Sequence, residues 1–165
     1  MPMTVLDRSV GYPVRGTTRL VVIPASLMSD GVLDTAALTS ATTVDVTNDA
    51  GPSISGFSGD QGELPDPDLG SQQTGALPGE ITFANSSLTF RLSKSGPADD
   101  IRAVLHTGDE VYLLIADQGL AAGKTCDLVH ATVKYGTKQR EDVARIMIPF
   151  SIHEVRTDVI IPALV

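Results

Sequence analysis

The sequence contains no tryptophan, a single cysteine and no apolar run near the ~20 residues of a membrane helix. With only Cys126 available, the chain forms no internal disulfide and no zinc site built on cysteines. Aromatic residues are only 4% of the sequence, so Val, Ile and Leu must fill its core. The stretch from Met1 to Arg8 lacks the apolar segment of a signal peptide. We therefore expect neither a leader there nor membrane insertion of this chain.

Positive charge is also scarce. The chain has 12 Lys and Arg against 20 Asp and Glu, a net charge of −8, which argues against binding of free nucleic acid. No basic residue lies between Arg19 and Arg91. Two interpretations stay open: this stretch is a solvated loop face, or it keeps one surface negative so that polyanions slide past without binding. Its acids are Asp30, Asp34, Asp45, Asp49, Asp60, Glu63, Asp66, Asp68 and Glu80.

What is present fits one mainly β domain of 165 residues, 42% of them apolar. Its organising stretch predicts a strand at Glu80–Leu92, a short helix at Pro97–Thr107 and a strand at Glu110–Ala116. Pro97 suits the first position of the helix, and Gly108 suits its C-cap. The unbroken apolar run of the last strand predicts burial on both faces. We expect one small helix packed against a β-sandwich or half-barrel.

The remaining elements are predicted from the alternation of apolar with polar residues and from the residues that favour turns. The apolar residues of Glu80–Leu92 alternate with polar ones, and this alternation shifts by one residue near Ala84–Ser87, which predicts a bulge or bend. Asp34 is expected to cap a single helical turn. Further strands are predicted at Thr17–Ala25 and Ala41–Thr47, and a long hairpin at Asp127–Tyr135 and Ala144–Ile152 with a polar tip at Gly136–Asp142. Pro149 favours an edge position or a local break.

Three segments lie outside this pattern: an extended arm at 1–16, a Gly- and Pro-rich loop at 48–78 and an apolar C-terminal extension at 157–165. A compact domain rarely keeps so long a loop without a use, and exposed aliphatic side chains favour an interface. We expect these segments and the polar hairpin tip to contact neighbouring subunits. The suspected contact residues are Phe57, Leu64, Leu69, Lys138, Arg140, Val159, Ile160 and Ile161.

Sequence motifs that would indicate catalysis or metal binding are incomplete. Gly119–Thr125 has three residues between its glycines where a phosphate-binding loop has four, and a strand is predicted to follow it, so a plain turn is favoured. His106, His130 and His153 lack metal-ligand spacing. Asp66–Gly70 lacks the acids that complete a calcium loop. Cys126 has no activating neighbours, so a buried small side chain is expected. We expect no enzyme, no cofactor and no metal.

The order of segments resembles the major tail tube protein of long-tailed, siphovirus-type bacteriophages, especially those of actinobacterial hosts. The resemblance extends over about Thr17 to Pro162 and lies in an ordered set of segments. These are Asp-Thr-Ala-Ala-Leu leading into Thr-Thr-Val-Asp-Val, a Gly-rich loop, Pro-Gly-Glu-Ile-Thr-Phe-Ala-Asn-Ser-Ser-Leu-Thr-Phe, Asp-Asp-Ile-Arg-Ala-Val-Leu, Val-Tyr-Leu-Leu-Ile and Ala-Arg-Ile-Met-Ile-Pro-Phe-Ser-Ile.

The resemblance implies a β-sandwich subunit with one helix, six of which form a ring whose inner strands join into a β-barrel. It implies that rings stack into a tube in the virion tail, assembled in the host cytoplasm around a tape measure protein. Tail terminator and baseplate or tip proteins would complete it, and DNA would pass through without specific binding. A small β-sandwich binding or decoration module of a virion stays open as the alternative, although it usually shows clustered exposed aromatics. A hydrolase is disfavoured by the missing motifs.

Overall fold

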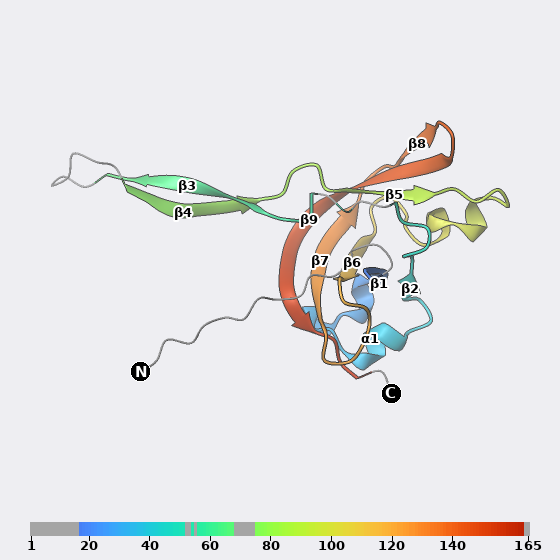
Figure 1. Ribbon diagram of the computed structural model, residues 1–165, viewed down its shortest axis with the longest axis horizontal. Coiled ribbons are helices and arrows are strands. Elements are labelled where there is room, and N and C mark those ends of the chain that lie inside the picture. Colours follow the sequence, from blue (N-terminus) through green and yellow to red (C-terminus); the bar gives the residue numbers. More distant parts are fainter. Residues whose placement is uncertain (1–16, 52–53, 55, 68–74, 164–165) are drawn as a thin grey trace.

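The computed structural model describes residues 17–51, 54, 56–67 and 75–163. This part is mainly β, as expected, with antiparallel strands throughout (Figure 1). The strands are β1 (Arg19–Pro24), β2 (Val44–Asp45), β3 (Asp60–Asp66), β4 (Gly75–Thr82), β5 (Ser87–Arg91), β6 (Glu110–Ala116), β7 (Thr125–Val133), β8 (Thr137–Arg140) and β9 (Ala144–Ile160). One α-helix, α1 (Thr35–Thr39), and four short 3-10 turns complete the described elements: η1 (Ala25–Leu27), η2 (Ser29–Gly31), η3 (Pro97–Asp99) and η4 (Ile101–Ala103).

The main sheet is built around β6, which pairs with β1 on one side and β7 on the other. Its strand order is β2-β1-β6-β7-β9-β5, and β8 also pairs with β9. Every residue from Val111 to Ala116 is buried, so the predicted two-sided burial of this strand is confirmed. Alternate side chains point to opposite faces, and each face packs into its own apolar cluster.

The first cluster lies within the main sheet, between its strands β1, β6 and β7 and its last strand, β5. It receives Val111, Leu113 and Ile115 from β6 and closes against Phe90 of β5 and Phe150 of β9. The second cluster lies on the other face, beneath η1, η2 and α1, and contains Tyr112, Leu114 and Ala116. The predicted cap of α1 is confirmed, because the Asp34 carboxylate accepts a hydrogen bond of 2.7 Å from the Ala37 N–H.

The predicted helix at Pro97–Thr107 is wrong: the chain forms η3 and η4, which Asp100 separates in extended conformation. The Asp100 carboxylate accepts hydrogen bonds from the backbone N–H groups of Ser93 (3.0 Å) and Arg102 (2.9 Å). A side chain that binds nearby backbone in this way competes with continuous helix. The apolar stripe is nevertheless used, because Ile101 and Leu105 are buried in the first cluster.

The predicted strand at Glu80–Leu92 is two strands that belong to different sheets. β4 ends at Thr82, β5 starts at Ser87, and Asn85 between them has a left-handed φ of 57°. The phase change therefore marks a complete break, close to where a bulge was expected. The stretch 48–78, expected to be a loop, contains β3 and the first half of β4, which pair as a two-stranded hairpin. This β3–β4 hairpin projects from the body of the molecule (Figure 1).

The hairpin predicted near the C-terminus is confirmed as an antiparallel pairing of β7 with β9, but with a different partner stretch. β7 pairs with β9 from Thr125 opposite Ile160 to Val133 opposite Phe150, so Ala144–Ile152 contributes only its last three residues. Two further details differ from the prediction. The polar tip contains β8, which pairs with the start of β9. Strand β9 also continues to Ile160, so the expected extension at 157–165 begins inside a strand. Pro149 lies where β9 leaves its partners β5 and β8 and joins β7, which fits the predicted local break.

The C-terminal aliphatic residues have different surroundings. Ile161 is 1% exposed and packs in the second cluster, whereas Ile160 is 67% exposed. The backbone of Ile161 bonds the turn between β6 and β7, donating to the Lys124 carbonyl and accepting from the Gly123 N–H. The expectation that Val159, Ile160 and Ile161 all reach a neighbour is therefore wrong for Ile161, which its own subunit buries.

We predict that Ile161→Ala lowers the free energy of unfolding by about 2–5 kcal/mol, because it removes buried methyl groups and leaves a cavity. The matched variant Ile160→Ala should cost below about 1 kcal/mol, since its side chain is already largely in water. Chemical denaturation of both variants measures the difference. Equal losses for the two would show that Ile161 is not part of the core.

The Arg102 guanidinium, which hydrogen-bonds the Asp100 carboxylate, lowers the pKa of Asp100 to about 2. Because the pKa of Asp100 is lower in the folded state than its ordinary value, the ionised carboxylate stabilises the fold. This stabilisation is complete above about pH 4 and is lost as pH falls through about 2. Asp100→Asn should therefore cost about 1–2 kcal/mol at pH 7 and progressively less between pH 4 and pH 2. The exposed neighbour variant Asp99→Asn is the control. A cost that does not change with pH would contradict the ionic origin.

Candidate assembly surfaces

The main sheet ends in open edges. From Ile152 to Ile160, β9 pairs with β7 on one side, and no strand of the described residues pairs with its other side. At the opposite end, β2 is two residues long, and among the described strands it pairs with β1 alone, at Val21 and Val22. The unpaired N–H and C=O groups of an edge strand are a template for another strand. The sheet can therefore be extended by a neighbouring chain.

The β3–β4 hairpin is a second exposed surface. Leu64 lies directly opposite Leu77 across the two strands, so both side chains are on one face, and they are 56% and 50% exposed. The described hairpin residues include no Lys or Arg. Its acids are Asp60, Glu63, Asp66 and Glu80. The hairpin thus presents an apolar pair within an acidic surface.

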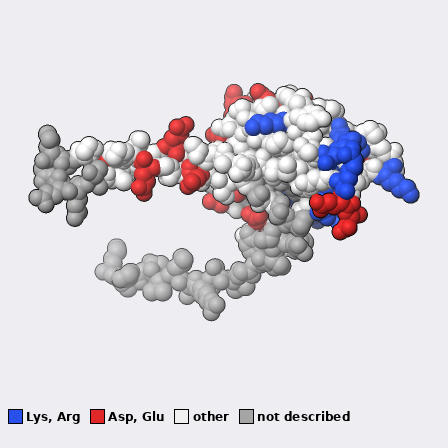
Figure 2. Space-filling model, turned by 90° about the horizontal axis from the view of Figure 1, so that it is seen from above, with Lys and Arg blue, Asp and Glu red and all other residues white. Residues whose placement is uncertain are grey.

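The opposite end of the molecule is basic. Arg91 at the end of β5 lies directly opposite Arg145 of β9, an arrangement in which like charges repel. Lys138 and Arg140 project from the neighbouring β8. Within the part of the chain that the structure describes, none of these four has a carboxylate within 4 Å. Figure 2 shows acidic residues along the hairpin, and at the far end of the body basic residues gathered beside a smaller group of acidic ones.

The structure separates the suspected contact residues into three groups. Phe57 and Ile161 are buried in their own subunit, and Phe57 packs on Phe150 with ring centroids 6.0 Å apart. The suspected contact of Phe57 with a neighbouring subunit is therefore wrong, because the core of its own subunit buries the ring. Leu69 lies outside the described residues. Exposed surface remains at Leu64, Lys138, Arg140 and Ile160, with Val159 partly buried.

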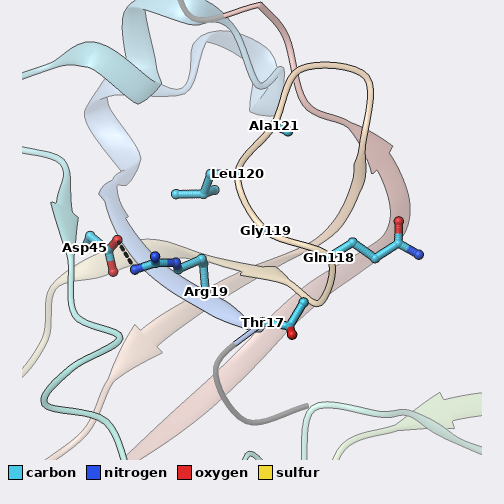
Figure 3. Close-up of a pocket in the computed structure, with 7 residues that line it drawn as sticks. All are labelled: Thr17, Arg19, Asp45, Gln118, Gly119, Leu120 and Ala121. Carbon is cyan, nitrogen blue, oxygen red and sulfur yellow. Dashed lines mark ion pairs between the residues drawn. The ribbon is translucent and has the colours of Figure 1, made fainter. Parts of the chain in front are cut away.

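A hollow of about 560 Å³ lies beside the start of β1 (Figure 3). Arg19 points toward Asp45 at its rim, with 3.8 Å between the charged groups. The Gly119–Thr125 turn passes along it, and its Gly123 N–H is bound to Ile161. A strand follows this turn, not the helix whose N-terminus would hold a phosphate. The arrangement is that of a turn packed on a sheet, as the sequence predicted.

Two histidines come closer than their sequence spacing indicates. The rings of His130 and His153 are 5.1 Å apart, and Tyr112 stacks on His130 at 4.5 Å. The His153 Nε2 lies 2.7 Å from the Thr132 hydroxyl. Sequence spacing missed this pair because a bulge in the β7–β9 pairing brings the two rings together across strands. Among the described residues, no group of three or more His, Cys, Asp or Glu could hold a metal ion.

Cys126 is buried, and burial raises the pKa of its thiol to about 11, with a smaller contribution from the nearby Asp127. The thiol therefore stays protonated at neutral pH and is a poor nucleophile. No helix among the described residues is long and apolar enough to cross a membrane. The surfaces that stand out are thus edges and charged ends suited to association.

Comparison with known proteins agrees with this geometry. No curated protein matches the sequence. A family model described as phage tail tube protein matches residues 7–163, which is almost the whole chain. This is the family that the order of the sequence segments resembles, so that expectation is confirmed at the level of the family. The chain therefore belongs to the phage tail tube protein family.

Proposed function

We propose that this chain is the repeating subunit of a bacteriophage tail tube, in which six copies form a ring and stacked rings form a channel for the genome. Family membership makes it a structural component of a phage tail. The open edges of a sheet that is already covered on both faces support the finer proposal most strongly.

The two covered faces of the sheet leave its edges for association. Because apolar clusters fill both faces of the sheet, another subunit cannot pack face to face on it without displacing η1, η2 and α1 or β5. The remaining route of growth is edge to edge, from β9 of one copy toward the β2 end of the next. These are different surfaces, so the contact is heterologous and generates a ring when the rotation between copies closes. A closed ring removes the edges.

The charge supports a conduit for DNA. A net charge of −8 per chain gives roughly −48 for a ring of six. Salt screens this charge beyond ~8–10 Å, so it repels phosphates only near the wall, which opposes sticking without blocking entry. On this proposal the tape measure protein occupies the channel during assembly, and tail terminator and tip proteins close the tube ends. Assembly would take place in the host cytoplasm.

Electron microscopy of the purified chain tests the proposal. Rings or hollow tubes should appear as the protein is concentrated, and sedimentation velocity should show growth beyond the monomer. The folded monomer, verified by circular dichroism, is the reference state. A folded chain that forms neither rings nor tubes at any concentration would contradict the proposal and favour the decoration module.

A further inference from the structure

The basic end of the molecule contains a groove beside β8 with a volume of about 290 Å³. Its lining includes the apolar side chains of Leu105, Ile146 and Ile148, which are largely buried. Lys134 and Lys138 also line the groove. The groove therefore combines an apolar floor with cationic groups.

The lysines of this groove lack ionic partners in the described part of the chain. No described carboxylate comes within 4 Å of Lys134 or Lys138. Arg140 follows Lys138 by two residues on the same strand, so both project from one face of β8. By contrast Arg102, which also lines the groove, is neutralised by Asp100 at 2.6 Å. The exposed lysines and Arg140 are therefore free to pair with an anionic group of another molecule.

The β3–β4 hairpin has the complementary properties. It carries acids and no basic residue among its described positions, and it exposes the apolar pair Leu64 and Leu77. An isolated two-stranded hairpin is at best marginally stable in water, so a partner surface would stabilise it. The hairpin cannot reach the groove of its own chain, because the two lie at opposite ends of the molecule (Figures 1 and 2).

We propose that the hairpin of one copy docks on the β8 groove of a second copy. Leu64 and Leu77 cover the apolar floor, and the hairpin carboxylates approach Lys134, Lys138 and Arg140. This contact is head to tail, so two copies leave one hairpin and one groove free, and the contact propagates from copy to copy. The proposal rests on the proposed function in that it assigns one of the contacts by which tube subunits associate.

Charge reversal at both surfaces tests the pairing. The basic variant K138E/R140E and the hairpin variant D60K/D66K should each weaken self-association at least tenfold, because like charges then face each other. Asp60 and Asp66 are an even number of residues from Leu64 and so lie on its face of β3. Combining the four changes in one chain should restore association, since opposite charges meet again. All changes are at exposed positions, so the thermal transition of each variant should stay near that of the wild type. Lys124→Glu, an exposed lysine in the turn between β6 and β7, is the control and should have little effect.

Sedimentation at low and high salt, with electron microscopy of the same samples, separates the outcomes. Salt-sensitive association that both reversals weaken and their combination restores supports the docking, even if no tubes form and the proposed function fails. If the wild type forms tubes and both reversal variants form them equally well, the docking is overturned and the proposed function stays intact. If the wild type retains duplex DNA and K138E/R140E does not, the docking is overturned in favour of a polyanion site. Absence of self-association at every concentration and salt overturns both.

Discussion

The burial of the main sheet on both faces is the constraint on which the rest of the structure depends. Strand β6 supplies three side chains to each apolar cluster, so neither cluster forms without it. Strands β1 and β7 repeat this division, with Leu20 and Val129 in one cluster and Val21 and Leu128 in the other. Because each face is covered by elements of the same chain, the monomer completes its own core, and association is left to edges and ends.

The β3–β4 hairpin, in contrast to the main sheet, buries little of its side-chain surface. Its strands pair with each other, and their side chains are almost all exposed. Burial of apolar area, the main source of folding free energy, therefore contributes little to holding it. Exposed aliphatic pairs on such an element are stabilised when another surface covers them. If the proposed docking holds, fold and assembly would use different parts of the sequence: strands with two buried faces for the core, and the acidic hairpin with one apolar pair for contact.

The sequence predicted the parts of the fold that carry a strong local pattern. Val111–Ala116 could be recognised because burial on both faces leaves a continuous apolar run, and β7 and β9 because they alternate. The β3–β4 hairpin could not, because exposed strands rich in Gly and Pro have no apolar period, and their pairing is non-local. The helix expected at Pro97–Thr107 failed because apolar spacing does not show that Asp100 binds the backbone of Ser93 and Arg102.

For the candidate surfaces, the sequence indicated individual residues but not how the fold groups them. Lys138 and Arg140 stood out as charges in a turn, but their grouping with Arg91 and Arg145 depends on the register of β5, β9 and β8. Residue spacing also could not distinguish Ile160 from Ile161, because the change of face between them follows from the pairing of β9 with β7 and from the bond of Ile161 to the preceding turn.

The two kinds of surface differ in the forces that they offer. A strand edge associates through backbone hydrogen bonds between neutral groups, which salt screens little. The acidic hairpin and the basic end attract through exposed charges, whose interaction weakens steeply once the Debye length falls to a few Å. If edges join copies within a ring and charged ends join successive rings, ionic strength acts mainly on stacking. On this arrangement, the basic end of a chain with −8 overall would be matched to acids of a second copy.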